Sequence, residues 1–130
     1  MILTFMIQFG RIISIQTNSD KVKEQIEEIN HISIDLRELV YSAPSQWVWD
    51  SVGSAVSMEE IAETIEKIES NVQKVQQHCD EEYKEVTDAL LAIMWSGLQT
   101  KNYEAIPHAV KQLIGIKLDF EKEPFKPKFE

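Results

Sequence analysis

The sequence predicts a mainly α-helical protein, an antiparallel bundle of three to four helices with short β-strands at the termini that close one end. Apolar residues recur at steps of three and four along most of the chain, which is the spacing of a helix face. The helix-ending residues Pro44 and Gly97 separate these stretches. The composition is ordinary for a globular protein, with 43% hydrophobic and 27% charged residues among 130. A chain of this length builds one core, so we expect a single domain over residues 1–130.

The charge balance narrows the classes of partner. Lys and Arg number 13 and Asp and Glu number 22, which gives a net charge of −9. This excess argues against nucleic acid and against an anionic membrane as partners, because both require a basic face. The single cysteine, Cys79, cannot form an internal disulfide, so nothing indicates an oxidising compartment. We therefore expect a cytoplasmic protein, bacterial in style, without a membrane or nucleic-acid partner.

The N-terminal segment 1–16 is apolar and predicts a β-strand. Its odd positions carry apolar side chains with only Arg11 interrupting them, and alternation of this kind places them on one face: Leu3, Phe5, Ile7, Phe9, Ile13 and Ile15. A signal peptide is not expected, because the segment lacks a basic start and a small-residue cleavage site. The segment is also shorter than the roughly 20 apolar residues of a membrane span.

A first helix is expected to begin at Asn18-Ser19-Asp20, whose side-chain oxygens can accept hydrogen bonds from free backbone amides. An apolar stripe follows at helical spacing: Val22, Ile26, Ile29, Ile32, Leu36 and Leu39. Because the residue before a proline avoids the helical region, this helix should end before Pro44.

Residues 42–57 are expected to form the main loop. They contain Trp47 and Trp49, which point the same way in an extended segment. Two interpretations stay open: the rings plug the end of the core, or they contact a partner, since Trp is enriched at binding hot spots.

The segment 57–96 contains neither Gly nor Pro and predicts long helix. Ser57 and Glu60 have the spacing of a capping box. Apolar residues then follow at alternating steps of four and three: Ile61, Ile65, Ile68, Val72, Val75 and Cys79. At Cys79 the step of four repeats, so the segment is either one helix of about 40 residues, about 60 Å long, or a hairpin. We favour a break at His78-Cys79-Asp80, because a single rod would overhang a compact domain.

The C-terminal part predicts one more helix and a strand. Gly97 is expected to end the preceding helix, and Pro107 suits the first turn of the next one. That helix carries Ile106, Ala109, Val110, Leu113 and Ile114 on one face. The segment 116–120 alternates like a strand that could pair with the N-terminal strand, and the tail 121–130 should be extended.

Acidic residues concentrate between positions 57 and 88, where ten carboxylates and three lysines contribute −7 of the net −9. One interpretation is a solvated helix face with pairs such as Glu63–Lys67 and Asp80–Lys84. The other is a surface for a basic partner, with Glu81 and Glu82 among the binding residues. An inhibitor or immunity-type partner of a basic, nucleic-acid-cleaving toxin could work in this way.

Some of these carboxylates also have a spacing that suits a magnesium site. Glu60 and Glu63 share one helix face, and Glu85 and Asp88 share another. The pattern Glu-Glu-x-x-Glu followed by Glu-x-x-Asp resembles the all-helical nucleoside-triphosphate pyrophosphatases. That resemblance implies that Glu60, Glu63, Glu85 and Asp88 hold Mg²⁺ and that an activated water attacks the phosphate chain.

A second resemblance concerns Trp95-Ser96-Gly97 with Tyr103 eight residues after the tryptophan. It is similar to the Trp-x-Gly turn of the helical-hairpin proteins associated with type VII secretion, and implies a turn between two helices. We expect, ahead of both alternatives, a non-enzymatic acidic helical module that binds proteins without a cofactor through Trp47, Trp49, Glu81 and Glu82. The long apolar seam also suggests a homodimer.

Overall fold

The computed structural model describes the backbone of residues 2–41 and 58–128, and in these ranges the side chains from residue 16 onward. The expected loop 42–57, with Trp47, Trp49 and the capping residue Ser57, lies outside the described residues. The described elements are the helices α1 (Ile2–Tyr41), α3 (Met58–Gln76), α4 (Glu81–Gln99) and α5 (Ala105–Gly115), and the strands β1 (Lys117–Asp119) and β2 (Lys126–Lys128). The predicted fold class, a helical bundle with short strands, is confirmed.

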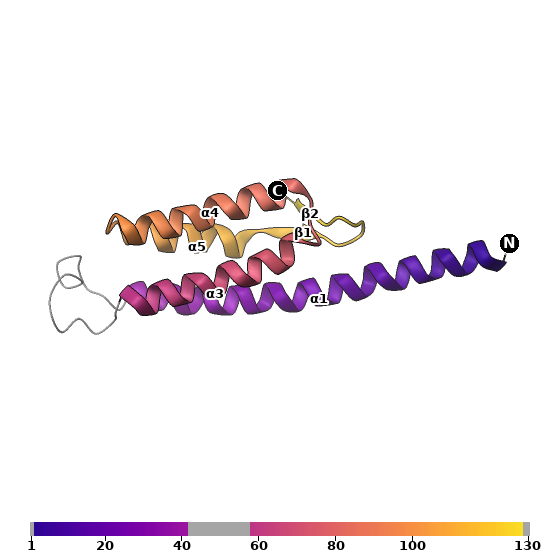
Figure 1. Cartoon of the computed structure of the whole chain (residues 1–130), viewed down its shortest axis with the longest axis horizontal. Coiled ribbons are helices and arrows are strands. Elements are labelled where there is room, and N and C mark those ends of the chain that lie inside the picture. Colours follow the sequence, from indigo (N-terminus) through magenta and orange to yellow (C-terminus); the bar gives the residue numbers. More distant parts are fainter. Residues whose placement is uncertain (1, 42–57, 129–130) are drawn as a thin grey trace.

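The described helices run alternately up and down and form two layers, α1 beside α3 and α4 beside α5 (Figure 1). Each helix contacts the two neighbouring helices around the bundle, so α5 also packs on α1. The N-terminal end of α1 extends past the other elements, on the side where β1 and β2 lie (Figure 1). The contacts thus make a four-helix arrangement in which one helix is longer than its partners.

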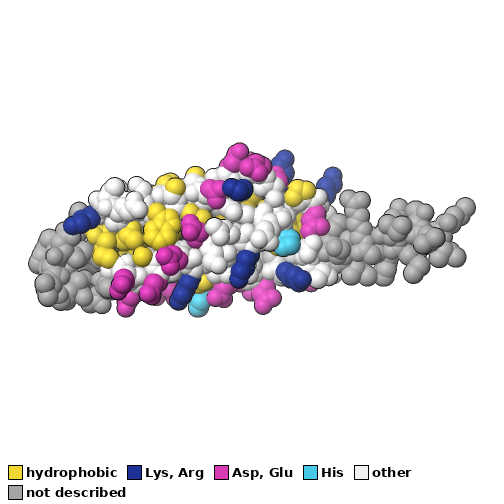
Figure 2. All heavy atoms as spheres, viewed as in Figure 1, with side chains coloured by type: hydrophobic (Ala, Val, Ile, Leu, Met, Phe, Trp, Pro, Cys, Tyr) yellow, Lys and Arg dark blue, Asp and Glu magenta, His cyan; other side chains and the backbone are white. Residues whose placement is uncertain are grey.

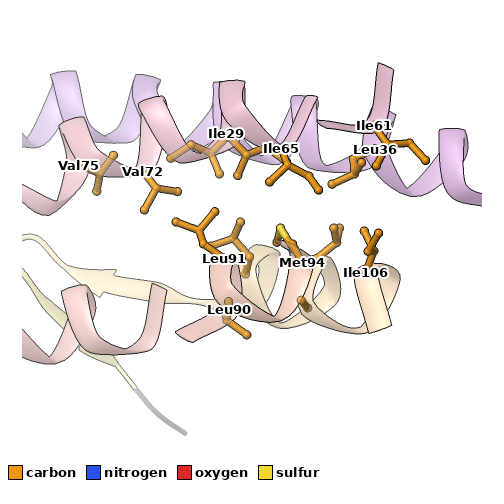
Figure 3. Close-up of a cluster of buried hydrophobic side chains, with 14 of the residues drawn as sticks. Ile29, Leu36, Ile61, Ile65, Val72, Val75, Leu90, Leu91, Met94 and Ile106 are labelled. Carbon is orange, nitrogen blue, oxygen red and sulfur yellow. The ribbon is translucent and has the colours of Figure 1, made fainter. Parts of the chain in front are cut away.

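The core lies between the two layers. The α3 positions predicted from the three-four spacing are all buried: Ile61, Ile65, Ile68, Val72 and Val75. Figure 3 shows Leu91 and Met94 of α4 opposite side chains of the other layer, which are Ile61, Ile65, Val72 and Val75 of α3 and Ile29 and Leu36 of α1. Burial of an aliphatic side chain of this size contributes about 1.5–3 kcal/mol, so this seam accounts for much of the packing between the layers.

The expected N-terminal strand is wrong, because residues 2–16 belong to α1. Apolar residues also occupy even positions of the segment, such as Ile2, Met6 and Ile12, so the alternation does not define one face. Extending a helix that already exists adds one hydrogen bond per residue without a new nucleus, whereas a strand needs a partner.

The expected helix start at Asn18-Ser19-Asp20 is wrong for the same reason, because α1 runs through it. Ser19 is buried, and the side-chain amide of Asn18 donates a hydrogen bond to the Glu123 carboxylate in the C-terminal segment. The stripe that begins at Val22 is confirmed, with Val22, Ile29 and Leu36 almost fully buried. The described part of α1 extends to Tyr41, and Pro44, before which the helix is expected to end, lies outside the described residues.

The favoured break in the segment 57–96 is confirmed at His78-Cys79-Asp80. Asp80 is the N-cap of α4, and its carboxylate accepts a hydrogen bond from the Tyr83 amide at 3.2 Å. Two successive steps of four around Cys79 therefore mark the point where the apolar seam passes from one helix to the next.

The turn between α4 and α5 differs from the prediction at Gly97. The helix continues to Gln99, and Lys101 takes the left-handed conformation at φ 61° that was expected for a glycine. Gly97 is buried inside α4, where an added Cβ would lie 2.9 Å from the Asn102 carbonyl oxygen. Gly97 is thus required for a close approach of backbone. The prediction for Pro107 is confirmed, because it lies in the first turn of α5.

The C-terminal segment closes the end of the bundle at the α3–α4 turn. The predicted strand at 116–120 is confirmed as β1, but it pairs antiparallel with β2 from the tail instead of an N-terminal strand. Phe125 is fully buried. Its backbone N–H donates a hydrogen bond to the His78 carbonyl, and its own carbonyl accepts one from the Asp80 backbone N–H, both at 2.9 Å. Phe120 meets Phe125 edge to face at 5.0 Å between ring centroids, and Lys23 lies over the Phe120 ring.

Candidate protein-binding surfaces

The structure does not bring together the four carboxylates of the expected magnesium site. Glu60 and Glu63 lie near the start of α3, whereas Glu85 and Asp88 lie near the start of α4. Asp88 accepts a hydrogen bond at 2.8 Å from Gln76, the last residue of α3. At 1.5 Å per residue, Gln76 lies about 24 Å along α3 from Glu60. Two consecutive antiparallel helices place their starts at opposite ends of the hairpin, so the two acidic pairs are far apart.

The surroundings of Asp88 also differ from those of a metal ligand. Its carboxylate lies 2.8 Å from the Lys84 ammonium. The hydrogen bond from Lys84, followed by that from Gln76, lowers the pKa of Asp88 below its usual range. Among the residues with described side chains, no group of three or more His, Cys, Asp or Glu could hold a metal ion. The residues present do not fit the magnesium site that the spacing suggested.

The expected helix pair Asp80–Lys84 is replaced by Lys84–Asp88. Asp80 is occupied as the cap of α4, so the lysine pairs with the carboxylate one turn further along the helix. The pKa of Lys84 is raised, mainly by the hydrogen bond to Asp88. The sequence contains both pairs at the same spacing, and only the position of the helix start decides between them.

Glu81 and Glu82 are exposed in the first turn of α4. With further exposed carboxylates of α3 and α4 they form what we call the acidic surface: Glu59, Glu63, Glu66, Glu81, Glu82 and Glu85. Within the described part of the chain, none of these side chains forms an ion pair. Figure 2 shows carboxylates over both α3 and α4. Glu59, Glu81 and Glu82 lie in the first turns of α3 and α4, where negative charge is compatible with the helix dipole.

The turn residues His78 and Cys79 have a structural role. The backbone of the turn is bound to Phe125, and Cys79 is half-buried beneath this contact. Burial, assisted by the nearby Asp80 carboxylate, raises the pKa of the Cys79 thiol to about 12. Burial likewise raises the pKa of Tyr83 above its usual range. A thiol that remains protonated at neutral pH is a weak nucleophile, so Cys79 is not suited to covalent catalysis.

The Trp-x-Gly resemblance is not borne out by the geometry. Trp95 and Gly97 lie within α4, and the turn between the helices comes after Gln99. The Trp95 indole packs half-buried against the core and donates a hydrogen bond to Glu69 at 3.3 Å, while Tyr103 is buried. These aromatic residues join helices of one bundle.

Between α1 and α3, the outside of the bundle carries a groove that the sequence did not predict, made up of two separate hollows. It contains a cavity of about 630 Å³ near the α3–α4 turn and another of about 460 Å³ toward the C-terminal end of α1. The amide of Gln25 on α1 donates a hydrogen bond to the side-chain oxygen of Asn71 on α3 in this groove. The signal in the sequence on α1 is the seven-residue spacing of Gln25, Ile32 and Leu39, of which Ile32 and Leu39 belong to the predicted apolar stripe.

Comparison with known proteins adds no relative. The chain matches no known protein family, no curated protein and no solved structure. In the described residues, no helix combines the length and apolar character that crossing a membrane requires.

Proposed function

We propose that this protein is a non-enzymatic helical module that binds a basic protein through the acidic surface on α3 and α4. The observation that carries the proposal is the set of exposed carboxylates on these helices that form no ion pair with described residues. An isolated carboxylate on a surface is ordinary, but a concentration of unpaired ones creates a negative field over that surface.

Such a field acts mainly on the rate of association. Complementary charges guide two proteins toward the correct orientation before contact, and the effect weakens as salt screens the charges. A protein that binds nucleic acid has the opposite, basic surface, and an acidic bundle could cover it. This supports an inhibitor or immunity-type role as the more specific form of the proposal, in a cytoplasmic setting without a cofactor.

The enzyme alternative receives no support from the geometry. A pyrophosphatase of the kind suggested by the spacing needs Glu60 and Glu63 close to Glu85 and Asp88, and the hairpin places these pairs at opposite ends. The secretion-associated alternative needs a turn at Trp95-Ser96-Gly97, where the chain is helical. Neither alternative has an observation in its favour.

The proposal can be tested with a fluorescent oligolysine peptide as a defined basic probe. The variant Glu81→Gln, Glu82→Gln, Glu85→Gln should weaken binding in an anisotropy titration by about tenfold, since each exposed ion pair contributes about 0.2–1 kcal/mol. The matched control Asp20→Gln, Glu27→Gln, Glu121→Gln removes as many exposed carboxylates elsewhere. Equal weakening by both variants would show that only net charge matters, and the acidic surface would then not be a binding site.

A further inference from the structure

The groove between α1 and α3 has a floor with a regular repeat. Six half-buried residues form the floor at a spacing of seven: Gln25, Ile32 and Leu39 on α1, Thr64 and Asn71 on α3, and His78 in the turn that follows α3. The hydrogen bond between Gln25 and Asn71 fixes which residues lie opposite each other. One cavity is lined by both Ile32 and Thr64, as that register requires. The floor therefore repeats with the period of a helix packed lengthwise in a bundle.

The two walls of this groove carry different charges. On α1 the charged residues that line the cavities are carboxylates, apart from Lys21 at one end: Glu24, Glu28, Asp35 and Glu38. On α3 the charged lining residues are Lys67 and Lys74. Figure 2 shows basic and acidic side chains close together along the lower part of the face it views. Charges that flank the seam between packed helices determine which helix is accepted as a partner.

We propose that this groove binds an amphipathic helix of another protein, with basic residues on the flank that contacts α1 and acidic residues on the flank that contacts α3. The two hollows of the groove together cover α1 from Lys21 to Leu39, which corresponds to about 27 Å or five helical turns. Binding of a helix in a groove between helices is a common mode of recognition, and charge complementarity along both walls specifies the partner.

The residues of the floor also indicate which side chains the partner helix should carry along the face that contacts them. Ile32 and Leu39 provide apolar contact toward the C-terminal end of α1, while Gln25 and Asn71 present amide groups nearer the α3–α4 turn. A buried amide next to a partner's apolar side chain would lose hydrogen bonds to water. The bound helix should therefore place Asn, Gln or Ser over the amide pair and apolar residues over Ile32 and Leu39.

The occupant that we propose is a helix of a different protein, and the oligomeric state in solution distinguishes it from a second copy of this chain. The large apolar side chains that are exposed on the described surface are Ile34, Tyr41 and Ile93. Among the side chains of residues 16–41 and 58–128, they do not form an apolar stripe of five turns on one helix. The occupant should thus be a helix whose apolar stripe is complete in its own sequence, which is the property of an amphipathic segment of a partner.

The test uses two synthetic helical peptides with the same composition and the same apolar stripe. In the segregated peptide, lysines occupy one flank and glutamates the other; in the mixed peptide, both alternate along each flank. We expect the segregated peptide to bind about tenfold more tightly in an anisotropy titration, because each of its flanks faces opposite charge. Mixed flanks are the appropriate control, since exchanging the flanks is equivalent to reversing the direction of the peptide.

Protein variants assign the binding to the groove. Lys67→Glu with Lys74→Glu makes both walls acidic, whereas Lys111→Glu with Lys122→Glu makes the same change in net charge at exposed sites outside the groove. The first variant should lose binding of the segregated peptide and gain binding of a peptide with lysines on both flanks. The second should do neither. Far-UV circular dichroism of both double variants should match that of the unsubstituted protein, so that a gain of binding by the first variant alone is assigned to the groove.

Three results would overturn the proposal. Equal affinity for the segregated and mixed peptides would show that the walls do not select charge. Equal effects of the two double variants would place the binding outside the groove. A dimer in sedimentation velocity that only Lys67→Glu with Lys74→Glu dissociates would assign the groove to a second copy of the chain.

Discussion

Two fully buried hydroxyl groups, Ser33 on α1 and Thr87 on α4, differ in their hydrogen bonds. The Thr87 hydroxyl donates a hydrogen bond to the Tyr83 backbone carbonyl at 2.7 Å and accepts one from the Gln76 side-chain amide at 2.9 Å. The Ser33 hydroxyl has no hydrogen-bond partner among the described residues. A buried polar group without a partner loses its bonds to water without replacement, so Ser33 destabilises the fold and Thr87 does not.

We therefore predict opposite effects of removing these hydroxyls. Ser33→Ala should raise the free energy of unfolding by about 1 kcal/mol, and Thr87→Val, which keeps the side-chain shape, should lower it by about 1 kcal/mol. Urea denaturation followed by far-UV circular dichroism measures both. If Ser33→Ala destabilised the protein as much as Thr87→Val, the serine hydroxyl would have a partner after all.

Gly97 gives a second prediction at the scale of single residues. Gly97→Ala would place a methyl group 2.9 Å from the Asn102 carbonyl oxygen and 3.3 Å from the Ile106 side chain. Overpacking of this kind costs about 1–3 kcal/mol, which exceeds the gain of about 1 kcal/mol in helix propensity. Gly115→Ala is the control, because nothing lies within 4 Å of its added Cβ and the substitution should be neutral or slightly stabilising. Thermal unfolding of both variants measures the difference.

At the scale of elements, Phe125 holds the C-terminal hairpin against the α3–α4 turn. Phe125→Ala should lower the free energy of unfolding by about 3–5 kcal/mol, because it leaves a cavity beneath the turn. Phe120→Ala, at a half-buried ring, should cost clearly less. The Asp80 amide donates to the Phe125 carbonyl, so its hydrogen exchange should accelerate in the first variant and change little in the second. Equal losses of unfolding free energy in the two variants would show that Phe125 does not hold the C-terminal hairpin against the α3–α4 turn.

The helices of the bundle could be predicted wherever one apolar stripe faces one core. The spacing of the α3 residues Ile61 to Val75 and the break at Cys79 follow from the period of the helix, which tertiary contacts do not change. The N-terminal strand was predicted wrongly because apolar residues without a clean period fit strand and helix equally well. The position of Gly97 could not be interpreted correctly, because its close neighbour Asn102 approaches only once the turn is built.

The candidate sites were less accessible from the sequence. Spacing along one helix shows which carboxylates share a face, but not which end of a hairpin they occupy, so Glu60 and Asp88 could be grouped in error. The sequence predicts that the acidic surface is rich in carboxylates. It does not show that these carboxylates form no ion pairs, which depends on the positions of the side chains in the fold. The groove between α1 and α3 depends on two stripes from helices that are far apart in the sequence, and their register is visible only in the hydrogen bond from Gln25 to Asn71.

At the scale of the whole molecule, a net charge of −9 on a small bundle makes stability depend on salt. Like charges repel more in the compact state, and salt reduces this repulsion once the screening length falls to about 8 Å at physiological ionic strength. We predict that sodium chloride raises the melting temperature. The variant Glu59→Gln, Glu63→Gln, Glu66→Gln should be more stable at low salt and respond less to added salt. A melting temperature that falls with salt would show that attractive pairs dominate the surface.

The contact of Phe125 with the α3–α4 turn also sets an order of events when the protein is made. Synthesis proceeds from the N-terminus at about 5–20 residues per second, and segments begin to fold as they leave the ribosome. All the described helices precede Phe125 in the chain, so they emerge before the residue that caps their common end. The nascent bundle therefore spends its first moments with the His78–Asp80 corner uncovered, and is most open to chaperones or premature association until the last strand arrives.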